Sequence, residues 1–269
     1  MRPQMGFITQ ADRGHGPPDR FAAAASLGPN LMLRFLSERG DWEIVEVSPF
    51  QLPLTRLFRM GKEPLAFGGR LWWVDVTCGA VTADPFSDRP ELSFVQLPRQ
   101  SVLPESAQDG GTVRYRRVGV SEGRLRYVEV SQDEPFLLSS FVLDDEGSSW
   151  TLEHQVVLNK IWARTTCIPL QMSGGDTDVV LIDPLDANVV YLMVMSQIVG
   201  VDMEREEVIE SCMCSSHGFC IPCVLPPWLG SSRIPSAGSD PLVLIASMLH
   251  VVLGFDFIFR CAMLADLWI

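Results

Sequence analysis

Basic charge is scarce in this sequence and is nowhere concentrated. The chain has 21 Lys and Arg residues against 33 Asp and Glu residues, which gives a net charge of −12. Proteins that bind nucleic acid need clustered positive charge, because the release of counterions from the phosphates supplies much of their affinity. We therefore expect no nucleic-acid partner.

Signals of secretion are also missing. The first thirty residues lack a basic start, a long apolar run and a small-residue cleavage site, and no Asn-x-Ser/Thr glycosylation acceptor occurs. The seven cysteines are odd in number and unevenly placed. We expect reduced thiols and a location in the cytoplasm or nucleus.

The sequence has no apolar run long enough for an ordinary membrane-spanning helix. Residues 239–269 form an atypical apolar tail in which Asp256, Arg260 and Asp266 carry the only charges after Pro241. A spanning helix needs about twenty consecutive apolar residues, whereas this tail has about fourteen, including His250, before Asp256. We expect a buried helix or an aberrant C-terminus in preference to a membrane anchor, and no membrane partner.

Helical periodicity is equally rare, and strand patterns fill the chain from residue 31 to residue 210. Runs of aromatic and β-branched residues alternate with turns of Gly, Asp and Pro, most clearly over residues 68–98. The pattern predicts about twelve short strands. They are expected at residues 31–37, 42–47, 65–76, 80–83, 92–97, 113–120, 124–131, 136–143, 150–158, 179–182, 189–194 and 198–202.

Two segments recur further along the chain. Residues 69–76 (Gly-Arg-Leu-Trp-Trp-Val-Asp-Val) return as residues 123–130 (Gly-Arg-Leu-Arg-Tyr-Val-Glu-Val). Residues 35–44 resemble residues 141–152, since both contain a strand, a tight turn and a Trp that opens the next strand. Periods of about fifty residues with several strands each are typical of the blades of kelch-type propellers.

A weaker echo links residues 83–86 with residues 182–185, both of which contain Asp-Pro. Together the repeats predict an all-β, propeller-like domain of antiparallel four-stranded units over residues 31–238. About twelve strands make about three blades, whereas closed propellers have roughly four to eight, so we expect an incomplete propeller. Residues 1–30, rich in Gly, Pro and Ala, are expected to be a mobile leader, although residues 21–25 fit either a strand or a helical turn.

Five motifs carry a family resemblance, and they are residues 69–75, 84–92, 116–128, 150–154 and 222–230 (Pro-Cys-Val-Leu-Pro-Pro-Trp-Leu-Gly). With them the chain resembles the plant domain-of-unknown-function family 1618 from about Pro18 to Gly238. That family is similar to the F-box-associated, kelch-like β domains, whose relatives recognise proteins. The resemblance implies no activity, cofactor or catalytic residue, so it transfers no site.

A cysteine-rich segment is the sharpest candidate site. It has the pattern Cys-x-Cys-x-x-His-x-x-Cys-x-x-Cys, and thiolate and imidazole groups suit Zn²⁺. Structural zinc sites, however, usually have two separated pairs of ligands, and this segment is one compact run. Reduced thiols without metal are therefore favoured, with a zinc-stabilised module as the alternative. The candidate ligands are Cys212, Cys214, His217, Cys220 and Cys223.

A second motif, Gly-Val-Ser-Glu-Gly around Ser121, matches the nucleophile elbow of serine hydrolases. An elbow leads from a strand into a helix, whereas a strand is predicted after Ser121, so the glycines better suit a hairpin turn. A serine nucleophile also needs a base such as histidine. His154 lies in a predicted strand, whereas the other three histidines lie in the leader, the cysteine segment and the tail. We expect no catalytic site, with a serine hydrolase through Ser121 as a weak alternative.

The remaining conspicuous residues fit structural roles. Tryptophans 72, 73, 150 and 162 are expected in the core or between blades, and the adjacent Trp72 and Trp73 must point to opposite faces of their strand. The acidic pairs at 144–145 and 206–207 are expected in solvated turns. The sequence thus predicts a non-catalytic protein-interaction module without cofactors, which binds a protein partner through loops near residues 101–112 and 119–123.

Overall fold

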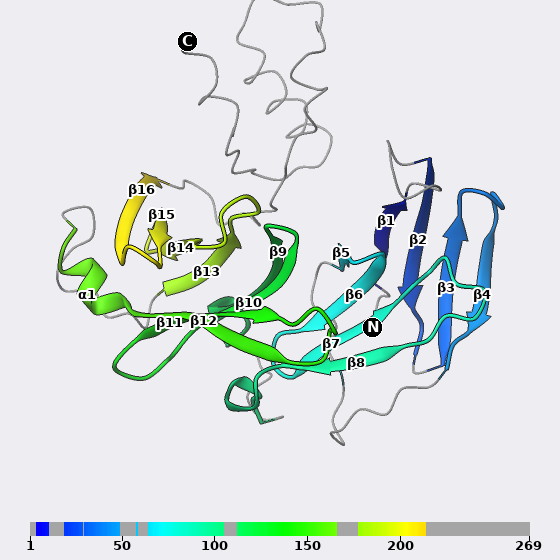
Figure 1. Ribbon diagram of the computed structural model, residues 1–269, viewed down its shortest axis with the longest axis horizontal. Coiled ribbons are helices and arrows are strands. Elements are labelled where there is room, and N and C mark those ends of the chain that lie inside the picture. The colour runs from blue at the N-terminus through cyan, green and yellow to red at the C-terminus, as the bar shows by residue number, and fades with distance from the viewer. Residues whose placement is uncertain are drawn as a thin grey trace, which may run out of the picture. The chain divides into compact units, whose positions relative to one another are not determined.

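The computed structural model describes residues 4–10, 19–28, 30–48, 58, 64–104, 112–165 and 177–213 (Figure 1). Within these residues sixteen strands form four sheets of four strands each. Within each sheet every strand pairs with the next strand along the chain, so each sheet is an antiparallel meander. The predicted all-β class and the four-stranded unit are both confirmed.

The sheets follow one another along the sequence. Sheet 1 consists of β1 (Gly6–Gln10), β2 (Arg20–Ser26), β3 (Leu31–Leu36) and β4 (Trp42–Glu46), and sheet 2 of β5 (Leu65–Phe67), β6 (Arg70–Asp75), β7 (Gly79–Ala83) and β8 (Ser93–Gln96). Sheet 3 consists of β9 (Arg116–Ser121), β10 (Arg124–Val130), β11 (Leu137–Leu143) and β12 (Trp150–Val157), and sheet 4 of β13 (Thr177–Ile182), β14 (Val189–Val194), β15 (Gln197–Asp202) and β16 (Glu207–Met213).

Helices are few and short in the described part of the chain. They are the 3-10 helices η1 (Arg99–Ser101) and η3 (Thr112–Tyr115) and the α-helix α1 (Leu158–Trp162). None of the helices among these residues has the length and apolar character needed to cross a bilayer. The expected apolar tail at 239–269 lies outside the described residues.

The structure corrects the predicted number of strands. β1 and β2 lie within residues 1–30, where a mobile leader was expected, and β16 was not predicted. The predicted strand at 65–76 is divided into β5 and β6 by a turn. Residues 21–25 form a strand although alanine has little intrinsic preference for one, because the small side chains of Ala22 and Ala24 are buried against sheet 2.

The first sequence repeat has a structural basis. Segments 69–76 and 123–130 contain β6 and β10, which are the second strands of their sheets, and each follows a two-residue hairpin turn. Both turn residues have positive φ, at 59° and 72° in Gly68 and Gly69 and at 49° and 69° in Glu122 and Gly123. Such values define the tight turn that suits the right-handed twist of a hairpin.

The weaker echo is a local turn and does not mark equivalent positions in two sheets. Asp84 Oδ1 accepts a hydrogen bond from the N–H of Phe86, and Asp183 Oδ1 accepts one from the N–H of Leu185, both at 2.8 Å. These are the same Asx turn. One turn follows β7, the third strand of sheet 2, and the other follows β13, the first strand of sheet 4.

The chain divides into two compact units, and the division passes through sheet 3. The first unit contains sheets 1 and 2 with Arg124–Tyr127 and Ser140–Glu153, and the second contains Ser121–Gly123, Val128–Ser139 and sheet 4. Each unit has a hydrophobic core of its own.

In the first unit sheet 2 is covered on both faces. Trp73 lies in a buried cluster with residues of sheet 1, while Trp72 lies in a second cluster with Tyr127 and Phe141 of sheet 3. The adjacent tryptophans therefore point in opposite directions, as predicted, and both are buried. Two apolar faces on one sheet mark it as an inner layer.

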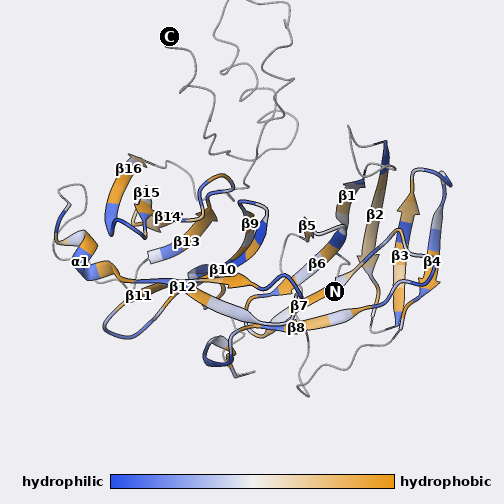
Figure 2. Cartoon of the chain, in the orientation of Figure 1, coloured by the Kyte–Doolittle hydropathy of each residue, from blue (hydrophilic) through white to orange (hydrophobic). Residues whose placement is uncertain are grey.

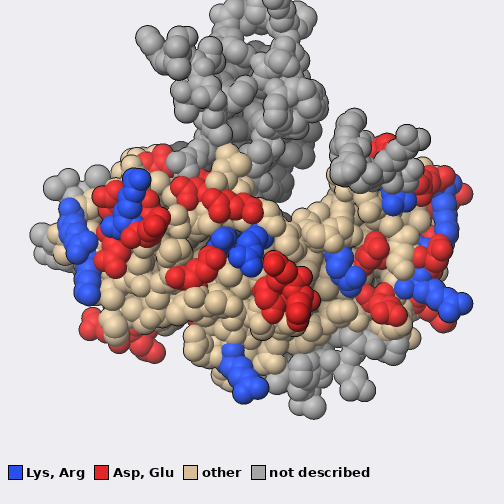
Figure 3. Space-filling view, viewed as in Figure 1, with Lys and Arg blue, Asp and Glu red and all other residues tan. Residues whose placement is uncertain are grey.

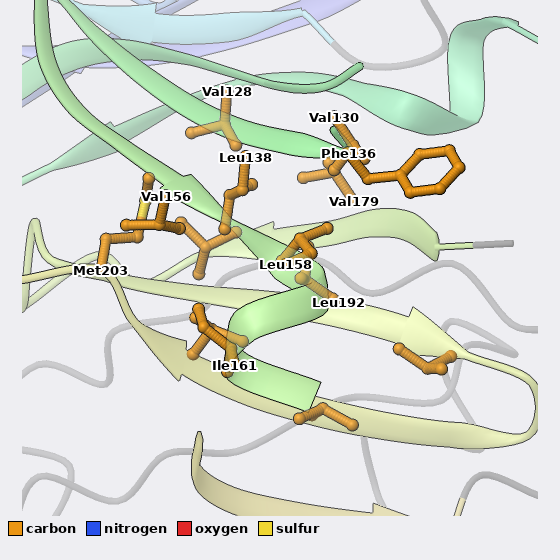
Figure 4. Close-up of a cluster of buried hydrophobic side chains, with 14 of the residues drawn as sticks. Val128, Val130, Phe136, Leu138, Val156, Leu158, Ile161, Val179, Leu192 and Met203 are labelled. Atoms are coloured by element: carbon orange, nitrogen blue, oxygen red, sulfur yellow. The ribbon is translucent and has the colours of Figure 1, made fainter. Parts of the chain in front are cut away.

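The core of the second unit joins its part of sheet 3 to sheet 4. Figure 4 shows Leu138 and Val156, together with Leu158 and Ile161 of α1, gathered near Leu192 and other residues of sheet 4. Leu138, Leu158 and Leu192 are fully buried. The short helix α1 thus adds apolar side chains to this core.

The turn between β11 and β12 is fixed by one carboxylate. Asp144 accepts hydrogen bonds from the backbone N–H of Ser148 at 2.7 Å and from the hydroxyl of Ser149 at 2.6 Å. These two hydrogen bonds hold the pKa of Asp144 well below its usual range, and the bond from the Ser149 hydroxyl has the larger effect. This acidic residue therefore has a structural role in its turn.

Asp144→Ala should lower the melting temperature at neutral pH, and the difference from wild type should fade in acid. A folded-state pKa that is depressed adds stability above the unfolded-state pKa of about 4, and this stability is lost as the pH falls below that value. Thermal melts between about pH 2 and pH 7 measure the difference. Asp145→Ala is the control, since its side chain is 98% exposed. A difference that stays constant over this range would contradict the role assigned to Asp144.

Candidate interaction face

The outer face of sheet 1 is the candidate functional site. Side chains alternate along a strand, and Ile8, Ala22, Met32 and Leu36 point into the core shared with sheet 2. Their neighbours along each strand therefore point the other way. We call the outer face the residues Phe7, Thr9, Phe21, Ala23, Ala25, Leu31, Leu33, Phe35, Trp42, Ile44 and Glu46.

An aromatic ladder crosses this face, with one ring from each strand. The ring centroids of Phe7 and Phe21 are 5.3 Å apart, those of Phe21 and Phe35 are 5.8 Å apart, and those of Phe35 and Trp42 are 5.4 Å apart. These separations are typical of interacting aromatic pairs. The ladder follows from the strand register, which places Phe35 opposite Trp42.

Most side chains of the outer face are exposed although the face is largely apolar. Phe7 is 58% exposed, Trp42 is 54% exposed and Ile44 is 63% exposed. A solvated face of an antiparallel sheet normally carries polar side chains. Here Glu46 is the one charged residue on the face, and Figure 2 shows that β3 is coloured hydrophobic over most of its length. An exposed apolar surface of this kind usually marks a contact site.

Charged side chains form ion pairs near the turn between β3 and β4. Arg20 pairs with Glu38 at 3.5 Å, and Arg39 pairs with Glu43 at 3.0 Å and with Asp88 at 3.5 Å. On the face of the molecule in Figure 3, basic side chains lie singly or in small groups among acidic ones. The view in this figure agrees with the lack of basic runs in the sequence.

Sheet 3 contains a covered counterpart of the ladder. Tyr127, Phe141 and Trp150 occupy its second, third and fourth strands, with ring centroids 5.8 Å apart for Tyr127 and Phe141 and 6.1 Å apart for Tyr127 and Trp150. Phe21, Phe35 and Trp42 occupy the same three strands of sheet 1.

In sheet 3 this face is buried by sheet 2. Tyr127 is 0% exposed and Phe141 is 3% exposed, against 38% for Phe21. The indole Nε1–H of Trp150 donates a hydrogen bond to the carbonyl of Gln96 on β8 at 2.9 Å. The outer face of sheet 1 thus has the composition of a face that another sheet covers.

The cysteine segment is mostly outside the described residues. Cys212 lies on β16 and is exposed, whereas Cys214, His217, Cys220 and Cys223 are not described. Among the residues that the structure places, no group of three or more His, Cys, Asp or Glu side chains could hold a metal ion. Reduced thiols without metal stay the prediction, and the zinc site stays the alternative.

Ser121 is not at an elbow. It is the last residue of β9, and the strand β10 follows after the turn of Glu122 and Gly123, where an elbow would have a helix. Its side chain is fully buried, and its Oγ has no hydrogen-bond partner among the described residues. His154, on β12, is half-buried.

The predicted binding loops offer little exposed surface where they are described. Gly119 and Ser121 belong to β9 and are buried, so the second loop is reduced to the two turn residues that follow. In the first loop Ser101 is buried, and its carbonyl accepts a hydrogen bond from Arg116. Val102 and Leu103 are half-buried and Pro104 is exposed, whereas residues 105–111 lie outside the described part.

The remaining predicted residues have structural positions. Trp72, Trp73 and Trp162 are buried and Trp150 is half-buried, as expected for core and inter-sheet packing. Of the second acidic pair, Glu206 lies in a turn with a φ of 53°, whereas Glu207 begins β16.

The outer face was missed from the sequence because β1 and β2 were not recognised. The sequence did contain a signal for this face. The repeat that aligns residues 35–44 with residues 141–152 makes Trp42 the counterpart of Trp150. A Trp begins the fourth strand of both sheet 1 and sheet 3. This shared position indicates that the corresponding faces of the two sheets both suit burial under another surface.

These features define an all-β protein made of successive four-stranded antiparallel sheets. Residues 73–191 match the sequence model of the family described as protein of unknown function (DUF1618), which confirms the predicted family resemblance. The match extends from β6 into β14, so the outer face of sheet 1 precedes it.

Solved structures were also compared with the chain. The chain is similar to apo AztD from Citrobacter koseri, with 14% sequence identity and a TM-score of 0.36 over 76% of this chain and 47% of that one. The chain therefore spans about half the length of that protein. None of the curated proteins matches it.

Proposed function

We propose that this protein is a non-catalytic protein-interaction module of the cytoplasm or nucleus and that it binds its partner through the outer face of sheet 1. One observation carries the proposal: the aromatic ladder of sheet 1 is exposed, whereas its counterpart in sheet 3 is covered by another sheet.

The chemistry of the face suits protein recognition. Aromatic residues that become buried on association supply much of the binding energy of protein interfaces, and charges are depleted from the centres of such interfaces. Phe7, Phe21 and Trp42 are aromatic anchors that are already held in place by ring contacts along the ladder. Such rigid side chains lose little conformational freedom on binding.

The double variant Phe21→Ser/Trp42→Ser should lose the specific partners of the wild type. Quantitative affinity capture with the full chain as bait measures this, and we expect recovery to fall at least about tenfold, since two aromatic anchors are removed. The variant should still fold, because both side chains are exposed. Far-UV circular dichroism checks this.

Leu152→Ser is the matched control. Leu152 lies on β12 and is 44% exposed, so its change removes a comparable exposed apolar side chain elsewhere in the protein. The control should capture the same partners as wild type. Equal capture by the wild type and the folded double variant would refute the placement of the binding site.

A further inference from the structure

We propose that the outer face of sheet 1 binds the same face of a second copy of this chain and so forms a symmetric dimer. The proposal rests on the interaction function given above and names the partner. It follows from the kind of surface that covers such faces, from the composition of the outer face and from its area.

The covering surface in this chain is another sheet. The aromatic face of sheet 3 is covered by sheet 2 through Trp72, Val74 and Val95, and the indole of Trp150 donates to a main-chain carbonyl of β8. Two sheet faces stack about 10 Å apart and interdigitate their side chains. A partner that presents an apolar sheet face therefore matches the outer face of sheet 1.

A second copy presents such a face. In a twofold dimer the same patch lies on both sides of the interface, so the patch has to complement itself. The outer face meets this condition, because its rings form a continuous ladder from β1 to β4 and no charged side chain interrupts it. Among the four rings of the ladder the indole N–H of Trp42 is the one polar group, so an identical stripe would leave few donors or acceptors unpaired.

The area is sufficient for a specific dimer. Four strands about 4.8 Å apart and about 17 Å long cover roughly 330 Å² in projection, and the accessible area is larger because the side chains stand above the sheet. Two such faces together bury on the order of 1,000 Å², which is the lower bound for a specific interface. Interfaces at this lower bound are typically weak and transient, so we expect a dissociation constant in the micromolar range.

Charge predicts how the dimer responds to salt. Each copy has a net charge of −12, so two copies repel each other. Salt screens this repulsion, with a Debye length of about 8 Å at physiological ionic strength, and does not weaken the apolar contact. The dimer should become tighter as the salt concentration rises.

Sedimentation velocity with the full chain tests the proposal, at about 1 to 100 μM protein, which brackets the expected dissociation constant, and at low and moderate salt. The wild type should pass from monomer to dimer over this range, and more readily at the higher salt. Phe21→Ser/Trp42→Ser should weaken dimerisation at least about tenfold, whereas Leu152→Ser should change it less than about twofold.

A second variant guards against loss of the fold. Ile44→Asp places one charge on the face at a side chain that is 63% exposed, so the monomer should tolerate it while the dimer should not. A wild type that stays monomeric to about 100 μM, or a dimer that both variants leave unchanged, would overturn the proposal.

The two proposals fail separately. If the wild type is monomeric and the double variant loses a captured protein, the face binds that protein, which refutes the second copy but keeps the interaction function. If the wild type dimerises through the face, the self-association is established whether or not another protein is captured.

Discussion

Trp73→Ala should lower the free energy of unfolding by about 4 kcal/mol, the range found for removal of a buried aromatic side chain. Trp73 is 1% exposed and lies in the middle strand pair of sheet 2, where it packs in the cluster that joins sheets 1 and 2. Its indole Nε1–H also donates to the carbonyl of Gln4 at 3.0 Å. The change leaves a cavity between two sheets and removes this hydrogen bond.

Trp42→Ala is the control for Trp73→Ala. It removes the same side chain from the exposed outer face, so it should lower the stability by no more than about 1 kcal/mol. Urea denaturation followed by far-UV circular dichroism measures both variants without relying on tryptophan fluorescence. Losses of similar size in the two variants would contradict the packing described for sheet 2.

Arg34→Met should lower the free energy of unfolding by about 3 kcal/mol, although the new side chain has a similar length. The Arg34 side chain is 2% exposed. Its Nε donates to Glu43 at 2.8 Å, and its Nη1 donates to the carbonyls of Pro85 at 2.9 Å and Ser87 at 2.5 Å. These bonds connect β3 to the turn after β7, so methionine would leave two carbonyls of that turn without their donor.

Arg39→Met separates the effect of burial from the effect of charge. Arg39 pairs with the same carboxylate of Glu43 at 3.0 Å, but its side chain is 52% exposed. Exposed ion pairs contribute little, so this variant should lose less than about 1 kcal/mol. If the loss in Arg34→Met is no larger than in Arg39→Met, the buried hydrogen bonds to the turn do not stabilise the protein as argued here.

The two sequence repeats show which structural features the sequence patterns predicted and which they did not. The segment around Trp72 and Trp73 predicted a strand after a glycine turn, and the structure has such a strand at the same place in two sheets. That prediction succeeded because turn residues with positive φ and alternating apolar residues act locally. The Asp-Pro echo misled for the same reason, since an Asx turn needs only its own few residues and forms after any strand.

The strands that sequence reasoning missed are defined by the strands they pair with and by the side chains they pack against. β2 is mostly alanine, which has little preference for strands. It is held by pairing with β1 and β3 and by burial of its alanines in the cluster that contains Trp73. β16 shows no regular alternation of apolar and polar residues and is exposed along most of its length, so pairing with β15 defines it. Pairing and packing of this kind leave no periodic signal in the strand itself.

The candidate site divides in the same way. The sequence pointed to Cys212 and Ser121 because metal and nucleophile motifs are short and local, yet the structure places Ser121 in a buried strand end and describes only Cys212 of the cysteine segment. The outer face became visible only when four strands were aligned. A surface made of every second residue of four strands has no motif.

The sequence by itself determined the all-β class, the four-stranded repeat and the family resemblance, because strand alternation and turn chemistry are encoded within a few neighbouring residues. Only the tertiary structure decided which apolar faces are covered. Phe141 and Phe35 occupy similar sequence repeats, yet sheet 2 buries the first, and the ladder of the second is exposed at Phe21 and Trp42. Burial depends on what packs against a sheet, and residues far apart in the chain supply that contact.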